Sequence, residues 1–85
     1  MKKYKCPCCG YYTLTEEPPN TYDICKVCDW EDDGLQYEDP NYEGGANDMS
    51  LNQAKESYFK IGAKSIEHIT HVRKPLDSEK EENQN

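Results

Sequence analysis

The clearest hydrophobic pattern in the chain lies over residues 51–61, where apolar positions recur every three or four residues. These positions are Leu51, Ala54, Tyr58 and Ile61. The spacing predicts an amphipathic helix with one apolar face. Ser50 and Gln53 form a capping box at its start, and Gly62 follows its last turn as a typical terminating residue. We therefore expect a helix over 51–61 whose apolar face packs on the rest of the protein.

Short stretches of aromatic and β-branched residues lie at 3–6, 11–15 and 21–24. Such stretches favour strands. Residues 16–20 contain two prolines, which cannot pair inside a sheet, so this segment is expected to turn. The N-terminal part is therefore expected to form a small β-hairpin with a third strand returning beside it.

Residues 63–76 carry a weaker pattern in which an apolar residue recurs at every third position. These residues are Ile66, Ile69 and Val72. The pattern is consistent with a short helix that ends before Pro75. His68 and His71 in the same segment form a pair that could hold a second metal ion, although such histidines are more often ordinary surface or half-buried residues.

Two Cys-x-x-Cys pairs carry the clearest chemistry, Cys6 with Cys9 and Cys25 with Cys28. Each pair places two sulfur atoms on one tight turn, and two such turns complete a four-thiolate shell around one ion. Two disulfides are the alternative, which we disfavour because residues 1–5 show no secretory signal and a cytoplasmic chain keeps its thiols reduced. We therefore expect these four cysteines to bind one metal ion in a cytoplasmic protein.

Cys8 is the fifth cysteine and is expected to be a small, partly buried thiol. It could also be a spare ligand that exchanges with Cys6 or Cys9, or a redox-sensitive thiol. We expect aromatic side chains to cover the sulfur atoms from water, and these are Tyr11, Tyr12, Tyr22 and Trp30.

Four thiolates accept zinc and iron alike. The segment from Lys3 to Tyr11 is similar to the first knuckle of rubredoxins, which hold one redox-active iron. Only 15 residues separate Cys9 from Cys25, a shorter loop than in rubredoxins, and this favours a zinc ribbon. We therefore predict one zinc per chain, with iron as the alternative.

The chain has 85 residues, which predicts a single domain over 1–76 and a disordered acidic tail over 77–85. The candidate core is thin: Leu14, Ile24, Val27, Trp30, Leu35, Leu51, Ala54, Tyr58, Ile61, Ile66, Ile69 and Val72. A structural zinc contributes about 10–16 kcal/mol of apparent binding free energy, which would offset this shortage. We therefore expect a small metal-stabilised α+β fold, with zinc-ribbon or rubredoxin-like β-hairpin knuckles followed by one main C-terminal helix.

The charge is strongly acidic and unevenly placed. The formal net charge is −7, and residues 29–48 carry eight acidic side chains and no basic one. Acidic surfaces repel phosphate backbones, which disfavours nucleic acid as a partner. No apolar run reaches the length of a membrane-spanning helix. The expected partner is an unknown protein with a basic surface, bound by a monomeric chain.

The acidic block fits neither of two further chemistries well. A calcium loop beginning at Asp29 would need a glutamate at its twelfth position, where Pro40 stands. Asp32 and Asp33 could serve acid–base catalysis, but no nucleophile or oxyanion-binding group accompanies them. We expect them on a solvated acidic face or in ion pairs with the helix. Asn47 is expected to hydrogen-bond loop backbone through its amide.

With these motifs in view, the sequence resembles the CPCC family of small cysteine-rich bacterial proteins over about residues 4–76. The matching residues are Cys6-Pro7-Cys8-Cys9-Gly10, Asp23-Ile24-Cys25, Cys28, Trp30-Glu31-Asp32-Asp33, Gly44-Gly45-Ala46-Asn47, Ser50-Leu51, Ala54, Gly62-Ala63, Val72-Arg73 and Pro75. Two departures from common zinc knuckles are Lys26, where proline is frequent, and Asp29, where glycine is usual. The resemblance implies metal binding and no particular activity.

The function that we predict is a non-enzymatic zinc-binding module that meets a protein partner through its acidic block. One concrete form is an acidic inhibitor or immunity-like protein that masks a nucleic-acid-binding surface. A four-thiolate iron electron carrier is the alternative, and an enzyme that uses Asp32 and Asp33 is the least favoured.

Overall fold

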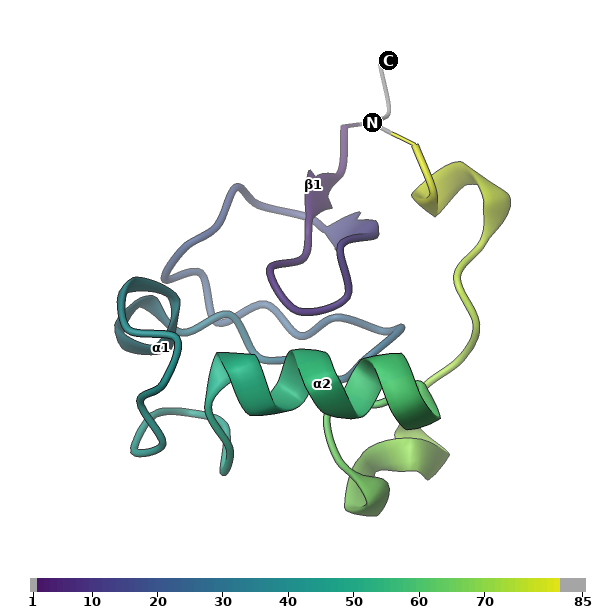
Figure 1. Cartoon of the computed structure of the whole chain (residues 1–85). Coiled ribbons are helices and arrows are strands. Elements are labelled where there is room, and N and C mark those ends of the chain that lie inside the picture. Colours follow the sequence, from purple (N-terminus) through teal and green to yellow (C-terminus); the bar gives the residue numbers. More distant parts are fainter. Residues whose placement is uncertain (1, 82–85) are drawn as a thin grey trace.

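A computed structural model describes residues 2–81 of the chain (Figure 1). A two-stranded antiparallel hairpin and a long irregular segment precede the main helix, and two short 3₁₀ helices follow it. The elements are β1 (Tyr4–Lys5), β2 (Tyr12–Leu14), α1 (Gly34–Glu38), α2 (Leu51–Ile61), η1 (Ile66–His71) and η2 (Asp77–Glu79). The predicted α+β fold, a knuckle-bearing hairpin with one main helix, is confirmed.

The hairpin holds the first cysteine pair in the turn between its strands. Tyr4 pairs with Leu14 and Lys5 with Tyr12, and an irregularity lies between the two pairs. The strands are shorter than the stretches 3–6 and 11–15 predicted, because the turn and the irregular pairing take up part of each stretch. Leu14 ends β2 fully buried.

The predicted third strand at 21–24 is wrong as a regular strand. Only Ile24 forms an isolated bridge there, with Glu31. Tyr22 has a φ of 60°, in the left-handed region, so the segment cannot remain extended throughout. The chain nevertheless returns beside itself, since Tyr22 N donates to the carbonyl of Asp32 at 2.9 Å.

The helix α1 was missed by the sequence analysis. Asp33 caps it, accepting hydrogen bonds from Leu35 N at 2.7 Å and Gln36 N at 3.3 Å. Asp33 is only 6% exposed and Asp32 is fully buried, so the expected solvated acidic face is wrong at these two positions. Asp32 instead accepts from Thr21 N at 3.1 Å and from its hydroxyl at 2.8 Å. These carboxylates compensate loop N–H groups that would otherwise be buried without partners.

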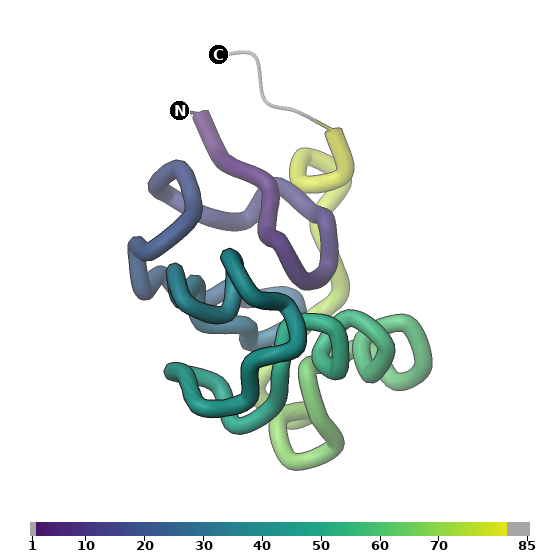
Figure 2. Tube along the Cα trace, turned by 60° about the vertical axis from the view of Figure 1, so that its left-hand side comes forward, coloured from purple at the N-terminus to yellow at the C-terminus, as the bar shows by residue number. Residues whose placement is uncertain are grey.

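A buried polar network joins the acidic segment to the rest of the fold. The Gln36 side chain donates to the carbonyl of Met49 at 2.8 Å and accepts from Asn47 Nδ2 at 2.8 Å. A side chain at Gly45 would come within 2.6 Å of Asp33 and 2.7 Å of Gln36, so only glycine fits beside the network. Figure 2 shows the irregular segment wound into a lobe next to α2.

Asn47 hydrogen-bonds backbone through its amide, as predicted, and it uses both ends of the amide. Its Oδ1 accepts from Glu31 N at 2.9 Å, and its Nδ2 donates to the carbonyl of Glu31 at 2.8 Å. The ammonium of Lys64 also donates to Oδ1, at 2.9 Å. Asn47 therefore bonds both backbone groups of Glu31, as a neighbouring strand would do.

The helix α2 is confirmed with its predicted bounds and both ends. Ser50 accepts from Gln53 N at 3.1 Å and Gln53 Oε1 accepts from Ser50 N at 2.9 Å, which completes the capping box. Gly62 ends the helix with a φ of 84°. Leu51 and Ala54 are buried against the cysteines, so the apolar face packs on the knuckles as expected.

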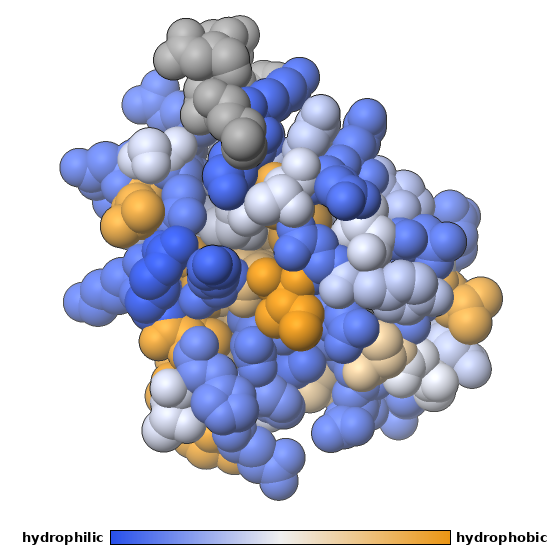
Figure 3. Space-filling view, turned by 180° about the vertical axis from the view of Figure 1, so that it is seen from behind, coloured by the Kyte–Doolittle hydropathy of each residue, from blue (hydrophilic) through white to orange (hydrophobic). Residues whose placement is uncertain are grey.

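Several residues that were predicted in the core lie at the surface. The exposed ones are Ile24, Leu35, Ile61, Ile66 and Ile69. The predicted core residues Leu14, Val27, Trp30, Leu51 and Ala54 are buried, and they form one cluster with Cys6, Cys8, Cys25 and Cys28. Sulfur atoms occupy the centre, and the last turn of α2 and all of η1 extend past it. On the face seen in Figure 3, apolar side chains form separate patches among hydrophilic ones.

The packed part of the chain continues past residue 76, where the tail was predicted to begin. Glu79 in η2 is buried and pairs with Arg73 through two hydrogen bonds of 2.9 and 2.8 Å. The Arg73 guanidinium lowers the pKa of Glu79. Within the predicted tail, residues 77–79 form η2, which this ion pair anchors beside β2, and residues 82–85 lie outside the described part.

Replacement of Asn47 by alanine is expected to lower the free energy of unfolding by about 1–3 kcal/mol, because Glu31 N and O lose their partner. Equilibrium denaturation of metal-loaded protein at fixed metal concentration measures the change. Asn41→Ala is the matched control, since Asn41 is exposed and bonds only exposed neighbours, and it should cost about 0.5 kcal/mol or less. Equal losses in the two variants would contradict the bridging role of Asn47.

Candidate metal centre

Both cysteine pairs lie on turns of the same construction. In the first, Gly10 N donates to the carbonyl of Cys6 at 2.9 Å, and in the second Asp29 N donates to that of Cys25 at 2.8 Å. Gly10 and Asp29 both have left-handed φ values, 82° and 73°. In each pair, this conformation reverses the backbone directly after the second cysteine. Both sulfur atoms of the pair can therefore face the same side of the turn.

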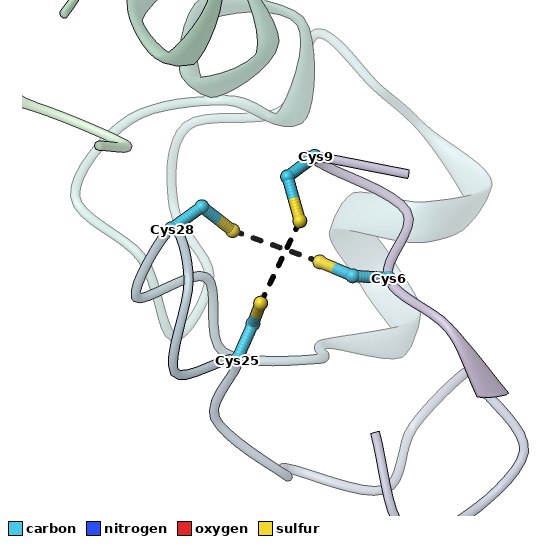
Figure 4. A group of neighbouring side chains, drawn as sticks. All are labelled: Cys6, Cys9, Cys25 and Cys28. Carbon is cyan, nitrogen blue, oxygen red and sulfur yellow. Dashed lines mark hydrogen bonds between the residues drawn. The ribbon is translucent and has the colours of Figure 1, made fainter. Parts of the chain in front are cut away.

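The four predicted ligand residues converge on one point (Figure 4). The Sγ atoms of Cys6 and Cys28 are 3.6 Å apart, as are those of Cys9 and Cys25, and all four lie within 4.8 Å of one another. A disulfide requires about 2.05 Å, so these contacts are not disulfides. Sulfur atoms bound at about 2.3 Å to one tetrahedral ion lie roughly 3.8 Å apart. The arrangement therefore fits a single four-coordinate metal ion.

Donors around the sulfur atoms suit thiolates. Cys8 N donates to Cys6 Sγ and Val27 N to Cys25 Sγ, both at 3.4 Å. The hydroxyl of Thr13 donates to Cys25 Sγ at 2.9 Å. Four thiolates around a divalent ion retain two negative charges, which such donors stabilise in a buried site. The role of Thr13 as a donor to a sulfur atom was not predicted. Its place in β2, shortly after the first cysteine pair, was the only hint of it in the sequence.

The close packing of the thiols shifts their pKa values in opposite directions. The pKa of Cys25 is lowered because the Cys28 side chain, followed by those of Cys6 and Cys9, hydrogen-bonds its sulfur. The pKa values of the other three are raised, first by the hydrogen bond with Cys25 and further by burial. An ion binds thiolates, so thiol protons must leave this buried cluster when it binds, which makes binding depend on pH.

Aromatic side chains cover the cluster, but not all of the predicted ones. Trp30 is buried, and Tyr11 lies edge-on to Tyr58 with ring centroids 6.3 Å apart. Tyr22 is 57% exposed, so its predicted covering role is wrong. Tyr58, which was predicted only as part of the helix face, takes this role. Its pKa is raised by burial and by the neighbouring thiol of Cys9.

Cys8 is buried as expected, at 8% exposure, and lies outside the four-sulfur group. Among residues 2–81 this group is the one place where three or more potential ligand atoms come within 4.8 Å of each other. The hydrogen bonds of Asp32 and Asp33 go to separate loop segments. In the same part of the chain, no helix is long and apolar enough to cross a membrane.

The hairpin knuckle, the second knuckle and the packed helix define a small zinc-ribbon-like protein with a four-cysteine site that could bind a metal ion. The family model described as cysteine-rich CPCC matches residues 4–79, so the chain belongs to this family. No curated protein sequence gives a significant match.

Replacement of Cys28 or Cys9 by serine should abolish stoichiometric metal binding, because a hydroxyl is a much poorer ligand than a thiolate. Elemental analysis of purified protein measures the ratio of metal to chain, and near-UV circular dichroism reports the loss of packing around Trp30. Cys8→Ser is the matched control and should retain both metal and fold. A Cys28→Ser protein that still holds one ion per chain would show that the ligand set is different.

Proposed function

We propose that the chain is a non-enzymatic zinc-binding module in which one zinc ion is held by Cys6, Cys9, Cys25 and Cys28. The observation that supports this is the four-sulfur cluster itself. Four protein ligands saturate a tetrahedral ion and leave no open position for water or substrate, which is typical of structural zinc. In this role the bound zinc stabilises the fold.

A zinc-bearing module of this composition belongs in a reducing compartment, because its thiols must stay free to bind the ion. We therefore propose a cytoplasmic protein. Zinc held by four thiolates makes the net charge of the chain more negative by two, to about −9 from −7. A partner with a basic surface would bind where this negative charge is exposed.

The acidic surface lies on α1 and the loop that follows it. Its exposed acidic side chains are Glu38, Asp39, Glu43 and Asp48, and exposed Tyr37 and Tyr42 stand among them. Tyrosine is frequent in protein interfaces, since it offers apolar area and a hydroxyl. This combination supports a protein partner with a basic surface, bound by a monomer, and an inhibitor or immunity-like role is one form of it.

The metal is tested first, on freshly purified, tag-free protein prepared with and without oxygen. We expect a colourless protein with one zinc per chain. A red protein that holds one iron and bleaches on reduction would make the chain an electron carrier instead, because four-thiolate iron is redox-active and zinc is not.

The interaction surface is tested with a photo-crosslinking amino acid placed at Tyr37, inside the acidic surface. The matched control places it at Phe59, which is 90% exposed on α2. A discrete crosslinked protein is expected at position 37 only, and its yield should fall with added salt and in a Glu38→Lys, Asp39→Lys variant. The acidic surface would not be the interface if both positions capture the same proteins, or if charge reversal leaves the yield unchanged.

A further inference from the structure

A second group of potential metal ligands lies beside the second knuckle, where Asp29 meets η1. Asp29 Oδ2 is 3.4 Å from His71 Nδ1 and 3.9 Å from His68 Nε2. The side chains of Asp29 and His68 are each 20% exposed, whereas that of His71 is 62% exposed. One carboxylate oxygen thus faces a nitrogen atom of each of two imidazoles.

Both distances are within the range of about 4 Å for an ion pair but longer than a direct hydrogen bond. A charge-assisted hydrogen bond between nitrogen and a carboxylate oxygen is about 2.7–2.9 Å long. Nitrogen and oxygen ligands of one tetrahedral zinc, each at about 2.0–2.1 Å from the ion, lie roughly 3.3 Å apart. The Asp29–His71 separation of 3.4 Å matches that ligand-to-ligand spacing, and His68 is within about 0.6 Å of it.

The ring of His68 is oriented by a hydrogen bond on its other nitrogen. Nδ1 of His68 lies 2.7 Å from Ser65 Oγ, which leaves Nε2 directed at Asp29. Metal-binding histidines are usually held in this way, with one nitrogen bonded to a polar neighbour and the other free for the ion.

Asp29 occupies a backbone position that would suit glycine. Its φ of 73° corresponds to the 82° of Gly10 in the first knuckle, and aspartate is among the few other residue types that adopt this region. The carboxylate is therefore delivered from a rigid turn, which the hydrogen bond from Asp29 N to the Cys25 carbonyl closes at 2.8 Å.

The segment η1 is held against the same knuckle at both of its ends. Lys64 N donates to the Cys28 carbonyl at 2.9 Å, and Arg73 N donates to the Lys26 carbonyl at 3.3 Å. η1 buries none of its own residues, so these bonds, with its contact to α2, fix where its histidines lie. An ion between Asp29 and the two histidines would add a direct link from η1 to the knuckle.

We propose that Asp29, His68 and His71 form a second divalent transition-metal site, separate from the four cysteines. The ring centroids of His68 and His71 are 5.9 Å apart, and two histidines on one zinc require roughly 5 Å. As they stand, the three ligand atoms do not all lie within 4.8 Å of one another, so a turn of the exposed His71 ring has to bring them together when an ion binds. Imidazole and carboxylate ligands suit zinc, nickel or cobalt, and a water molecule completes the shell. The proposal does not depend on the identity of the metal at the cysteines.

The test uses the full chain, prepared with one zinc per chain and then titrated calorimetrically with Zn²⁺. The wild-type protein should bind a second equivalent. Asp29→Asn, His68→Ala and His71→Ala should each weaken it by about tenfold or more, since even residues that only orient metal ligands contribute 10–100-fold. Glu67→Gln is the matched control, because Glu67 is an exposed residue of η1 outside the group.

Asp29→Asn keeps a side chain that tolerates the left-handed backbone, and Asp29→Gly removes the ligand and relieves that conformation together. All variants should retain the first zinc and the near-UV circular dichroism spectrum, which separates loss of the site from loss of the fold. A wild-type protein that binds a single equivalent overturns the proposal. So does a second equivalent that persists in the His71→Ala and Asp29→Gly variants.

Discussion

Convergence of four sulfur atoms at one point is the constraint on which the rest of this structure depends. The cysteines supply a large share of the buried cluster, and the remaining apolar side chains are arranged around them. A chain of 85 residues with this few buried apolar groups has little hydrophobic stabilisation to set against the entropy of ordering. Hydrogen bonding with Cys25 and burial raise the pKa values of Cys6 and Cys28, so a bound cation would stabilise thiolates that are otherwise unfavourable in this core.

The second constraint is polar and belongs to the segment between the second knuckle and α2. This segment has almost no regular structure, so its backbone groups need other partners. Asp33, Gln36 and Asn47 provide them, and all three are buried. The eight acidic residues of the block are thus of two kinds: some satisfy loop backbone inside the protein, and the exposed ones carry the charge that a partner would meet. The uneven charge of the sequence is partly a requirement of the fold.

These two constraints explain what could be predicted from sequence. The ligand positions and α2 follow from local rules, since Cys-x-x-Cys spacing, a capping box and Gly62 each act within a few residues. α1 was missed because five residues give no periodicity, and its only local signal was Asp33 before Leu35 and Gln36. Burial of Gln36 and Asp32 could not be predicted, because a polar side chain that bonds distant backbone has the same sequence appearance as a solvated one. Ile66 and Ile69 were predicted in the core because their spacing matches a helix face. They are exposed, because the buried cluster is formed by the cysteines and by apolar residues of other segments.

Asp29 shows how closely the two halves of the chain are joined through the second knuckle. A glycine would serve the backbone there without strain, as Gly10 does in the first knuckle. With aspartate, the turn that orients Cys25 and Cys28 also presents a carboxylate to η1, whose position is set by hydrogen bonds to carbonyls of the same turn. Any ligand that draws η1 toward Asp29 therefore acts on the turn that holds two of the four sulfur atoms. Occupancy at the two places is expected to be coupled, because the geometry of one knuckle contributes to both.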